Sequence, residues 1–364
     1  MQKYQIGLVP GPVSIPESIR QAWNTDYASS DLEHEFFVLY QENQELTQRL
    51  LHTENDIIIT SGEAMSILWA ALKCTLRPGE KLLAVSSGLF GEGFADMAKS
   101  FGVNAQVCAF DYDSVPDSQK VYEHAKKFRP KVISAVHCET PSGTLINHES
   151  LAELGSIARE VNALFVVDFV SSAGGAPLDV DECNIDIGLL GSQKVLSMTP
   201  TLSISSISPR AWEVIQDINY QGYESYINWR DVPEREYMPY THDWQSMKAL
   251  NISLNNIIMS EGLENVIARH DESAKLCRRL ALEMGLKLFP KSQEICSPTV
   301  SAFYIPEKFT WSEFNNALRE RGLAVGGNYG SLANKVFRIG HMGSQADINL
   351  IQNGMQIIKQ VISS

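Results

Sequence analysis

Short apolar runs alternate with amphipathic segments along the chain up to about residue 245. The runs are rich in Ile, Val and Leu and lack strict polar alternation, which is typical of strands buried on both faces. They predict strands over 56–60, 81–86, 131–136, 164–168, 185–190 and 202–207. Helices are predicted over 65–76, 91–101, 117–128 and 151–161. This alternation indicates βαβ units and a doubly wound, mostly parallel sheet.

The pattern changes after about residue 245, where longer helical segments dominate. They cover 245–259, 263–284 and 346–362, and short strand candidates lie at 299–305 and 335–339. A single hydrophobic core stops growing at about 250–300 residues, and this chain has 364, so we expect two domains. The predicted organisation is an N-terminal arm over 1–20, a large α/β domain over 21–245 and a small C-terminal α+β domain over 246–364.

Composition and net charge argue against several classes of function, including nucleic-acid binding and membrane association. Hydrophobic residues make up 44% and charged residues 20%, as in an ordinary folded protein. The net charge of −13 argues against nucleic acid or an anionic membrane as a partner. No apolar run reaches the roughly 18 residues of a membrane span, and the first residues do not resemble a signal peptide. We therefore expect a cytoplasmic protein that acts on small molecules.

The six cysteines are scattered without paired spacings. In a chain of this size such a distribution predicts reduced, mostly buried thiols and no metal site. The positions are Cys74, Cys108, Cys138, Cys183, Cys277 and Cys296.

Two polar residues follow predicted strands, at the sheet edge where open α/β folds bind ligands. Asp168 ends the run 164–168, where a carboxylate faces the crevice or serves only as a helix cap. Lys194 follows the run 185–190 in a Gly-Ser-Gln-Lys turn. Desolvation there would lower its pKa and make the amine nucleophilic, although an ordinary surface lysine fits the same pattern.

Two further residues suggest anion binding. Glu63 lies in a small-residue turn that precedes a predicted helix, where an anion cradle or a simple N-cap by Ser61 could form. Arg338 lies inside an apolar strand candidate and needs an anionic partner. That partner could be a bound carboxylate or an acidic side chain of the same chain.

Taken together, the motifs resemble those of one enzyme family. The order of four motifs along the chain resembles that of class-V, fold-type I aminotransferases, which use pyridoxal 5′-phosphate. In chain order the motifs are Phe90 in S-G-L-F-G, Asp168 in V-D-F-V-S-S, Lys194 in G-S-Q-K and Arg338 in F-R-I-G-H-M-G. The resemblance extends from the Pro-Gly-Pro at 10–12 to the arginine motif, and it is strongest to the alanine–glyoxylate and serine–pyruvate branch. It implies a large domain with a mostly parallel doubly wound sheet, a smaller C-terminal α+β domain and a homodimer.

The resemblance also implies catalytic roles. Lys194 would hold the cofactor as a Schiff base and carry the proton. Asp168 would pair with the pyridinium nitrogen, which makes the ring an electron sink, and Phe90 would stack on the ring. The implied reaction moves an amino group from a small L-amino acid of the alanine or serine type to glyoxylate or pyruvate.

Further contacts are implied at both ends of the cofactor and at the substrate. They involve Glu63, Ala64, Met65 and Gln193 at the phosphate end, Thr140 at the 3′-oxygen or phosphate, Tyr240 and Thr241 from the second subunit, and Arg338 with Gly11 at the substrate carboxylate.

Glu63 and Ala64 depart from the family pattern, which has a small hydroxylated residue and a glycine there. A carboxylate about 4 Å from a phosphate charge is repelled by about 4 kcal/mol at an effective dielectric constant near 20. The G-E turn, T-P-S-G at 140–143 and the motif Arg338–Gly343 resemble pyridoxamine–pyruvate aminotransferase, which takes free pyridoxal as a substrate. In that alternative Glu63 accepts a hydrogen bond from the 5′-hydroxymethyl group. Gln193, however, matches the phosphate-binding members.

Two other function classes are weaker. A lyase such as a cysteine desulfurase typically stacks a histidine on the ring and needs a reactive cysteine, for which Cys296 is the only candidate. A non-catalytic cofactor-binding module would have no need of Lys194, Asp168 and Arg338 together.

Overall fold

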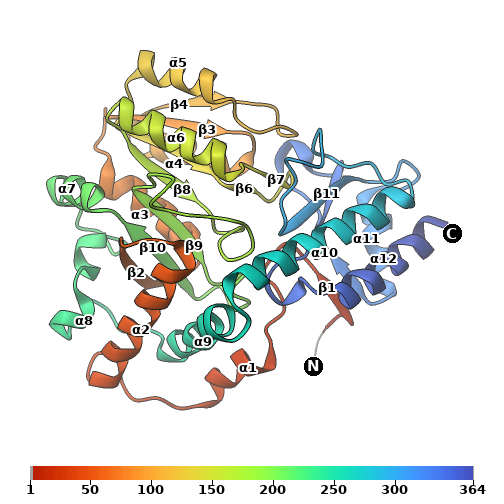
Figure 1. Ribbon diagram of the computed structural model, residues 1–364, viewed down its shortest axis with the longest axis horizontal. Helices are drawn as coiled ribbons and strands as arrows, with labels where there is room; N and C mark the ends of the chain where they lie inside the picture. Colours follow the sequence, from red (N-terminus) through yellow and green to blue (C-terminus); the bar gives the residue numbers. More distant parts are fainter. Residues whose placement is uncertain (1–2, 364) are drawn as a thin grey trace.

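The computed structural model describes residues 3–363 and is built around one central seven-stranded sheet (Figure 1). The strand order is β2-β10-β9-β8-β5-β3-β4. Their bounds are β2 Asp56–Ser61, β10 Leu202–Ile207, β9 Ile187–Gly191, β8 Leu164–Asp168, β5 Val132–Val136, β3 Lys81–Ser86 and β4 Asn104–Ala109. The strands predicted for this region are present with small shifts at their ends, and the edge strand β4 is an addition.

The sheet is parallel except around β10. This strand runs antiparallel to both neighbours, β2 and β9, with Ile204 opposite Ile59 on one side and Leu190 on the other. The pairs β9–β8, β8–β5, β5–β3 and β3–β4 are all parallel. The prediction of a mostly parallel α/β sheet is therefore confirmed, and the carboxyl ends of β8 and β9 lie at the same edge.

Helices cover the sheet, and the predicted helical segments are all present. Helices α5 and α6 pack together over β3 and β8, whereas α3 packs against α4 and α7 (Figure 1). The helices around the sheet are α2 His34–Leu51, α3 Met65–Thr75, α4 Leu89–Ser100, α5 Ser118–Phe128, α6 His148–Glu160, α7 Pro209–Ile218 and α9 Trp244–Asn255.

A second, smaller core forms from the C-terminal part of the chain and its first strand. Strand β1 (Ile6–Leu8) pairs in parallel with β12 (Leu323–Val325), beside the antiparallel pair β11 (Val300–Tyr304) and β13 (Val336–Gly340). The helices of this core are α10 Leu263–Glu283, α11 Trp311–Glu320 and α12 Ile348–Ser363. The short elements of the chain are α1 Glu17–Arg20, α8 Val232–Arg235, β6 Cys138–Glu139, β7 Thr144–Leu145, the turns η1 Gln21–Asn24, η2 Tyr226–Trp229, η4 Gly330–Leu332 and η5 Gly343–Gln345, and the π-helix η3 Asn256–Glu261.

Helix α10 runs from one core to the other. Val266 near its start packs in the core of the large sheet, whereas Cys277 and Ala281 near its end belong to the smaller core. Helix α9, after residue 243, also packs in the large core through Leu250. The predicted arm at 1–20 and the boundary at 245 stay predictions. None of the helices within residues 3–363 combines the length and the apolar character that a membrane crossing requires.

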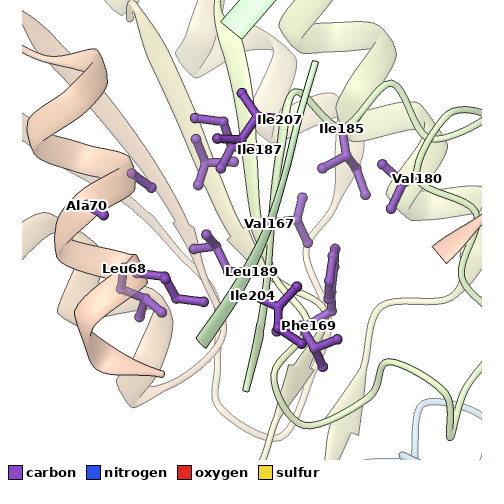
Figure 2. Packing of buried hydrophobic residues seen from close by; sticks show 14 of the residues in the cluster. Leu68, Ala70, Val167, Phe169, Val180, Ile185, Ile187, Leu189, Ile204 and Ile207 are labelled. Atoms are coloured by element: carbon purple, nitrogen blue, oxygen red, sulfur yellow. The ribbon is translucent and has the colours of Figure 1, made fainter. Parts of the chain in front are cut away.

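The core of the sheet is mostly aliphatic and buried, with Phe169 among its aromatic members (Figure 2). Leu68 and Ala70 of α3 pack on one side of β9 and β10, and Val180 and Ile185 lie on the other. Burial of each such aliphatic side chain stabilises the fold by about 1.5–3 kcal/mol. Leu68 also contributes to the wall of the cavity described below, so the core directly supports the site.

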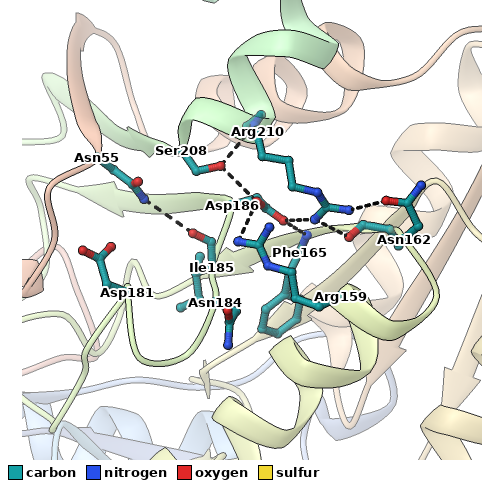
Figure 3. Close-up of polar contacts among 12 residues, drawn as sticks. Asn55, Arg159, Asn162, Phe165, Asp181, Asn184, Ile185, Asp186, Ser208 and Arg210 are labelled. Carbon is teal, nitrogen blue, oxygen red and sulfur yellow. Dashed lines mark hydrogen bonds and ion pairs between the residues drawn. The ribbon is translucent and has the colours of Figure 1, made fainter.

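A buried carboxylate fixes the opposite edge of the sheet. Asp186, just before β9, is fully buried and accepts hydrogen bonds from the main-chain N–H of Phe165 and from Ser208 Oγ, both at 2.9 Å (Figure 3). Arg210 Nη1 lies 2.9 Å and Arg159 Nη2 3.3 Å from its oxygens. Because both carboxylate oxygens are paired, this charge joins β8, β9, α6 and α7 instead of destabilising the interior.

Candidate active site

One cavity of about 300 Å³ lies where the carboxyl ends of β8 and β9 meet the N-terminal segment. Most residues predicted for the site line it: Gly11, Glu63, Ala64, Met65, Phe90, Asp168, Gln193 and Lys194. Thr140, Tyr240, Thr241 and Arg338 are not part of its wall. The cavity therefore lies at the edge of the sheet where α/β folds bind ligands, and the roles assigned to its residues stay predictions.

Lys194 crosses the cavity toward the N-terminal segment. Its Nζ donates a hydrogen bond to the carbonyl oxygen of Pro10 at 2.5 Å. Its side chain passes so close to Gly11 that a Cβ at that position would lie 2.5 Å from Lys194 Cδ. Gly11 also has φ +93°, a conformation that glycine adopts most readily. The residue before the cis peptide bond to Pro12 thus leaves the space that the lysine occupies.

The amine of Lys194 is easier to deprotonate than an ordinary lysine. Burial, together with the cation of Arg338, lowers its pKa to about 8. Cys138, Asp168 and Glu63 oppose this shift. About a tenth of the amine is therefore neutral near pH 7, and a neutral amine is the form that attacks a carbonyl.

Asp168 provides a buried negative charge at the end of β8. Burial and, to a smaller extent, the charge of Glu63 raise the pKa of this carboxyl, which is about 6. The main-chain N–H of Val170 donates to Oδ1 at 2.8 Å and, with the nearby Lys194, favours the ionised form. The group is mostly ionised at neutral pH and is suited to pairing with a cation in the cavity.

The sequence-based reasoning did not find Cys138, which also lines the cavity. Its position two residues before Thr140 in an extended segment was the available signal, because alternate residues face the same side. Its Sγ donates to Ser297 Oγ at 3.1 Å, and burial raises its pKa to about 11. The thiol therefore stays protonated and acts as a wall.

Glu63 occupies the anion position at the start of α3. It lies exposed at the mouth of the cavity, and its Oε2 accepts the main-chain N–H of Met65 at 2.9 Å. Gln193 Nε2 donates to its other oxygen, Oε1, at 2.8 Å. The N–H groups and the positive end of a helix dipole are what a phosphate would need there. In this chain the carboxylate of Glu63 already accepts the hydrogen bonds from Met65 and Gln193.

Arg338 lies beside the cavity, on β13. Its Nε donates to the carbonyl oxygen of Gly327 at 2.8 Å, and its guanidinium lies 5.0 Å from the ring centroid of Tyr329. It is 4% exposed, and among residues 3–363 no carboxylate forms an ion pair with it. The internal salt bridge considered from the sequence is thus not formed within the described chain. A buried guanidinium without an acidic partner is suited to a ligand carboxylate.

The remaining predicted residues lie away from the cavity wall. Thr140 is buried directly after β6. Tyr240 packs against Tyr223 with ring centroids 4.4 Å apart, and Thr241 is exposed. Their assigned contacts, which involve a cofactor or a second subunit, stay predictions. The part of the chain from 3 to 363 gathers no group of three His, Cys, Asp or Glu side chains that could hold a metal ion.

The family model "Aminotransferase class-V" matches residues 17–339 of the chain. The chain belongs to the class-V aminotransferases. It is 31% identical over 348 residues to the L-aspartate–glyoxylate aminotransferase of Paracoccus denitrificans, covering 93% of this chain and 86% of that one. It is 30% identical over 349 residues to the pyridoxamine–pyruvate transaminase of Mesorhizobium japonicum, covering 94% and 87%.

Solved structures of class-V aminotransferases have the same fold. The pyridoxamine–pyruvate aminotransferase of Mesorhizobium loti superposes with a TM-score of 0.94 at 27% identity, covering 99% of this chain and 92% of that one. The alanine–glyoxylate aminotransferase of a Nostoc species gives a TM-score of 0.93 at 27% identity, covering 99% and 95%. The resemblance inferred from the motifs is thereby confirmed.

Class-V aminotransferases of this kind depend on pyridoxal 5′-phosphate, and this member is a transaminase of that type. The residues fit the ring of this group, because the Lys194 amine and the Asp168 carboxylate lie in one cavity with Phe90. The phosphate end fits less well, because Glu63 holds the Met65 N–H and Gln193. The lyase alternative lacks its nucleophile: Cys296 is buried, and its pKa is raised to about 11 by that burial.

Proposed function

We propose that this aminotransferase moves an amino group from a small L-amino acid of the alanine or serine type to glyoxylate or pyruvate. The observation that carries the proposal is the arrangement of Lys194, Asp168 and Arg338. A partly neutral amine and a buried carboxylate line one cavity, and a guanidinium without an acidic partner lies close enough to influence that amine. The printed names of the relatives, which include alanine–glyoxylate and serine–glyoxylate aminotransferases, support the substrate class.

Each residue has a separate task in this proposal. The pyridoxal ring, when bound, supplies an electron sink for the substrate's α-carbon. The Nζ of Lys194 takes the proton from that carbon and delivers it to the 4′-carbon of the pyridoxal group. The carboxylate of Asp168 keeps the ring nitrogen protonated. The terminal nitrogens of Arg338 bind the α-carboxylate of both the amino acid and the oxo acid, because Nε is already bonded to Gly327.

The test uses the purified chain with pyridoxal 5′-phosphate, L-alanine or L-serine, and glyoxylate or pyruvate. We expect formation of the new amino acid, and borohydride treatment should attach the pyridoxyl group to the peptide that contains Lys194. The Lys194→Ala variant should show no steady-state turnover. Turnover by that variant would refute the assignment of the lysine, and absence of turnover by the wild-type chain with every pair would refute the substrate class.

Glu63 favours a second candidate, the transfer between free pyridoxamine and pyruvate. Its carboxylate already accepts hydrogen bonds from donors that a phosphate would use, and such a carboxylate accepts a further hydrogen bond from a neutral hydroxymethyl group without charge repulsion. In this candidate pyridoxal is a substrate that leaves after each turnover. Uptake of free pyridoxal in preference to its phosphate, with pyruvate-dependent release of pyridoxal from pyridoxamine, would support it over the first candidate.

We also propose that the enzyme is a homodimer and that Tyr240 and Thr241 reach the pocket of the second subunit. Their support is the exposure of large apolar side chains near this segment, with Tyr223 and Tyr237 each 58% exposed. Sedimentation should give a dimer. Co-expression of Lys194→Ala with Tyr240→Ala should restore activity, because one mixed pocket contains both intact residues. A fully active monomer would contradict this proposal.

A cytoplasmic location completes the proposal. All six cysteines are buried and unpaired, a state that a reducing compartment maintains. Fractionation of the producing cells, with the enzyme detected by antibody, tests it. Enzyme found only outside the cytoplasmic fraction would overturn it.

A further inference from the structure

Glu139 is a buried carboxylate with no role in the reaction described above. It lies in β6, between Cys138 of the cavity wall and Thr140, and it is 2% exposed. Its Oε1 accepts the main-chain N–H of Gly91 at 2.7 Å, and its Oε2 accepts the N–H of Phe90 at 3.3 Å. Both donors belong to the first turn of α4.

Helix α4 depends on this carboxylate because it lacks a cap of its own. Its N-cap residue is Gly88, which has no side chain to cap the helix, and the nearby Ser86 Oγ accepts only the N–H of Gly88 itself, at 3.2 Å. A Cβ at Gly88 would lie 2.5 Å from Glu139 Cδ, so glycine leaves the space that the carboxylate needs. A negative charge at this position is favoured by the helix dipole and by the free N–H groups.

The contact determines where one wall of the cavity lies. Phe90 is in the turn that Glu139 bonds, and its ring lines the cavity with Asp168 and Lys194. The segment after Glu139 is tied to the substrate side as well, because Asn328 Nδ2 donates to the carbonyl oxygen of Pro141 at 2.7 Å. Asn328 precedes Tyr329, which stacks on Arg338.

We propose that Glu139 is a positioning residue: its carboxylate fixes the first turn of α4 so that the Phe90 ring is held in place to stack on the bound pyridine ring. The inference rests on the proposed function, because that function places a pyridoxal compound in this cavity. The alternative is that Glu139 only caps α4, which would stabilise the helix without affecting how the ligand binds.

The charge state of Glu139 gives the contact a measurable signature. Burial and, to a smaller extent, the nearby carboxylates of Asp168 and Glu92 raise the pKa of the carboxyl, the two N–H donors oppose the shift, and the resulting pKa is about 7. The phenol of Tyr112 and the thiol of Cys138 are further titratable groups that interact with its charge. Protonation weakens the acceptor, so the bonds to Phe90 and Gly91 are strongest above about pH 7 and weaken below it.

The test compares Glu139→Gln with the wild-type chain. The glutamine has the same size but directs an NH₂ group at one of the two N–H donors. We expect the dissociation constant for pyridoxal to rise about ten-fold, because the variant loses a charge-assisted hydrogen bond that holds the turn containing Phe90. The visible circular dichroism of the bound ligand should change, because the orientation of the ring against Phe90 is altered.

A second measurement needs no ligand. Amide hydrogen exchange of the peptide covering 89–92 should show lower protection factors below about pH 7 in the wild-type chain. This pH dependence should be absent in Glu139→Gln and retained in Glu139→Asp. The matched control is Asp117→Asn, because Asp117 caps the surface helix α5 through the N–H of Lys120 at 2.9 Å. That variant should leave pyridoxal affinity and dichroism unchanged.

The outcomes separate the two proposals. Equal pyridoxal affinity and dichroism in Glu139→Gln and the wild-type chain would overturn the role of Glu139 while leaving the aminotransferase assignment intact. Exchange of 89–92 that does not depend on pH in the wild-type chain would overturn it even if Glu139→Gln fails to fold. A wild-type chain that forms no borohydride-trapped adduct at Lys194 would overturn the proposed function instead.

Discussion

Gln193 Nε2 donates to Glu63 Oε1 at 2.8 Å, directly beside the end of α3 where a phosphate would bind. The other oxygen of the same carboxylate accepts the N–H of Met65. The pocket therefore contains an anion supplied by the chain itself, and any phosphorylated ligand must displace or repel it.

Replacing Glu63 with serine should change the preference between the two forms of the ligand. In Glu63→Ser both donors become available and one like charge is removed, so affinity for pyridoxal 5′-phosphate should rise at least about ten-fold relative to pyridoxal. Equilibrium dialysis with each compound measures the ratio. Glu213→Ser, on the exposed face of α7, serves as the control. An unchanged ratio in Glu63→Ser would mean that the carboxylate turns away when a phosphate binds.

Gly11 should tolerate no side chain, because Lys194 fills the space beside it. Gly11→Ala places a Cβ 2.5 Å from Lys194 Cδ and 2.7 Å from Nζ. Trapping of pyridoxal at Lys194 by borohydride should fall by more than about ten-fold. Gly79→Ala is a matched control: Gly79 also has positive φ, +84°, but nothing lies within 4 Å of a Cβ there. It should lose about 1 kcal/mol of stability through backbone strain and keep full trapping. Equal trapping in both variants would show that the lysine moves aside freely.

The reactivity of Lys194 should follow its lowered pKa. Only the neutral amine reacts with formaldehyde in reductive methylation, so the rate in the ligand-free chain should rise with pH and level off above about 8. Arg338→Gln removes the nearby cation that disfavours the ammonium form. The pKa should then rise and the rate profile should move to higher pH. Peptide mass spectrometry gives the rate at Lys194, and Arg279→Gln, on the exposed side of α10, should leave the profile in place. A shift to lower pH in Arg338→Gln would contradict this electrostatic account.

Asp186 should be among the most important polar residues for stability. Asp186→Asn removes a fully buried charge that pairs with two partly exposed arginines, Arg159 and Arg210, so the free energy of unfolding should fall by about 3 kcal/mol. Asp217→Asn removes an exposed pair with Arg77 and should lower it by less than about 1 kcal/mol. Urea unfolding of both variants measures the difference. Equal losses would mean that water reaches the Asp186 network.

The sequence predicts the buried strands well because burial on both faces leaves a continuous apolar run. The segment 164–168, for example, is strand β8 itself. The same property hides strand direction: Leu202–Ile207 is as fully buried as β9, yet β10 runs antiparallel to both of its neighbours. The edge strand β4 was missed for the opposite reason, because most of its side chains are at least partly exposed and it lacks an apolar run.

Residues at or shortly after the end of a buried strand could be predicted to lie near one another, because the fold brings the carboxyl ends of parallel strands to one edge of the sheet. Asp168 and Lys194 meet this condition, and both line the cavity. Glu139 could not be found in this way, because its role depends on two N–H groups that lie 48 and 49 positions earlier. The proposed contacts of Tyr240 and Thr241 with a second subunit likewise depend on packing that the pattern of one chain does not contain.

The pairing of β1 with β12 has a consequence for the order in which the site is made. Ile6 emerges from the ribosome early, but its partner Leu323 is synthesised 317 residues later. Until then nothing pairs with the first strand, so the Pro10 carbonyl beside Lys194 has no fixed place. The nascent chain can therefore assemble its central sheet while the catalytic pocket is still open on one side, and the pocket is completed only after β12 has been synthesised.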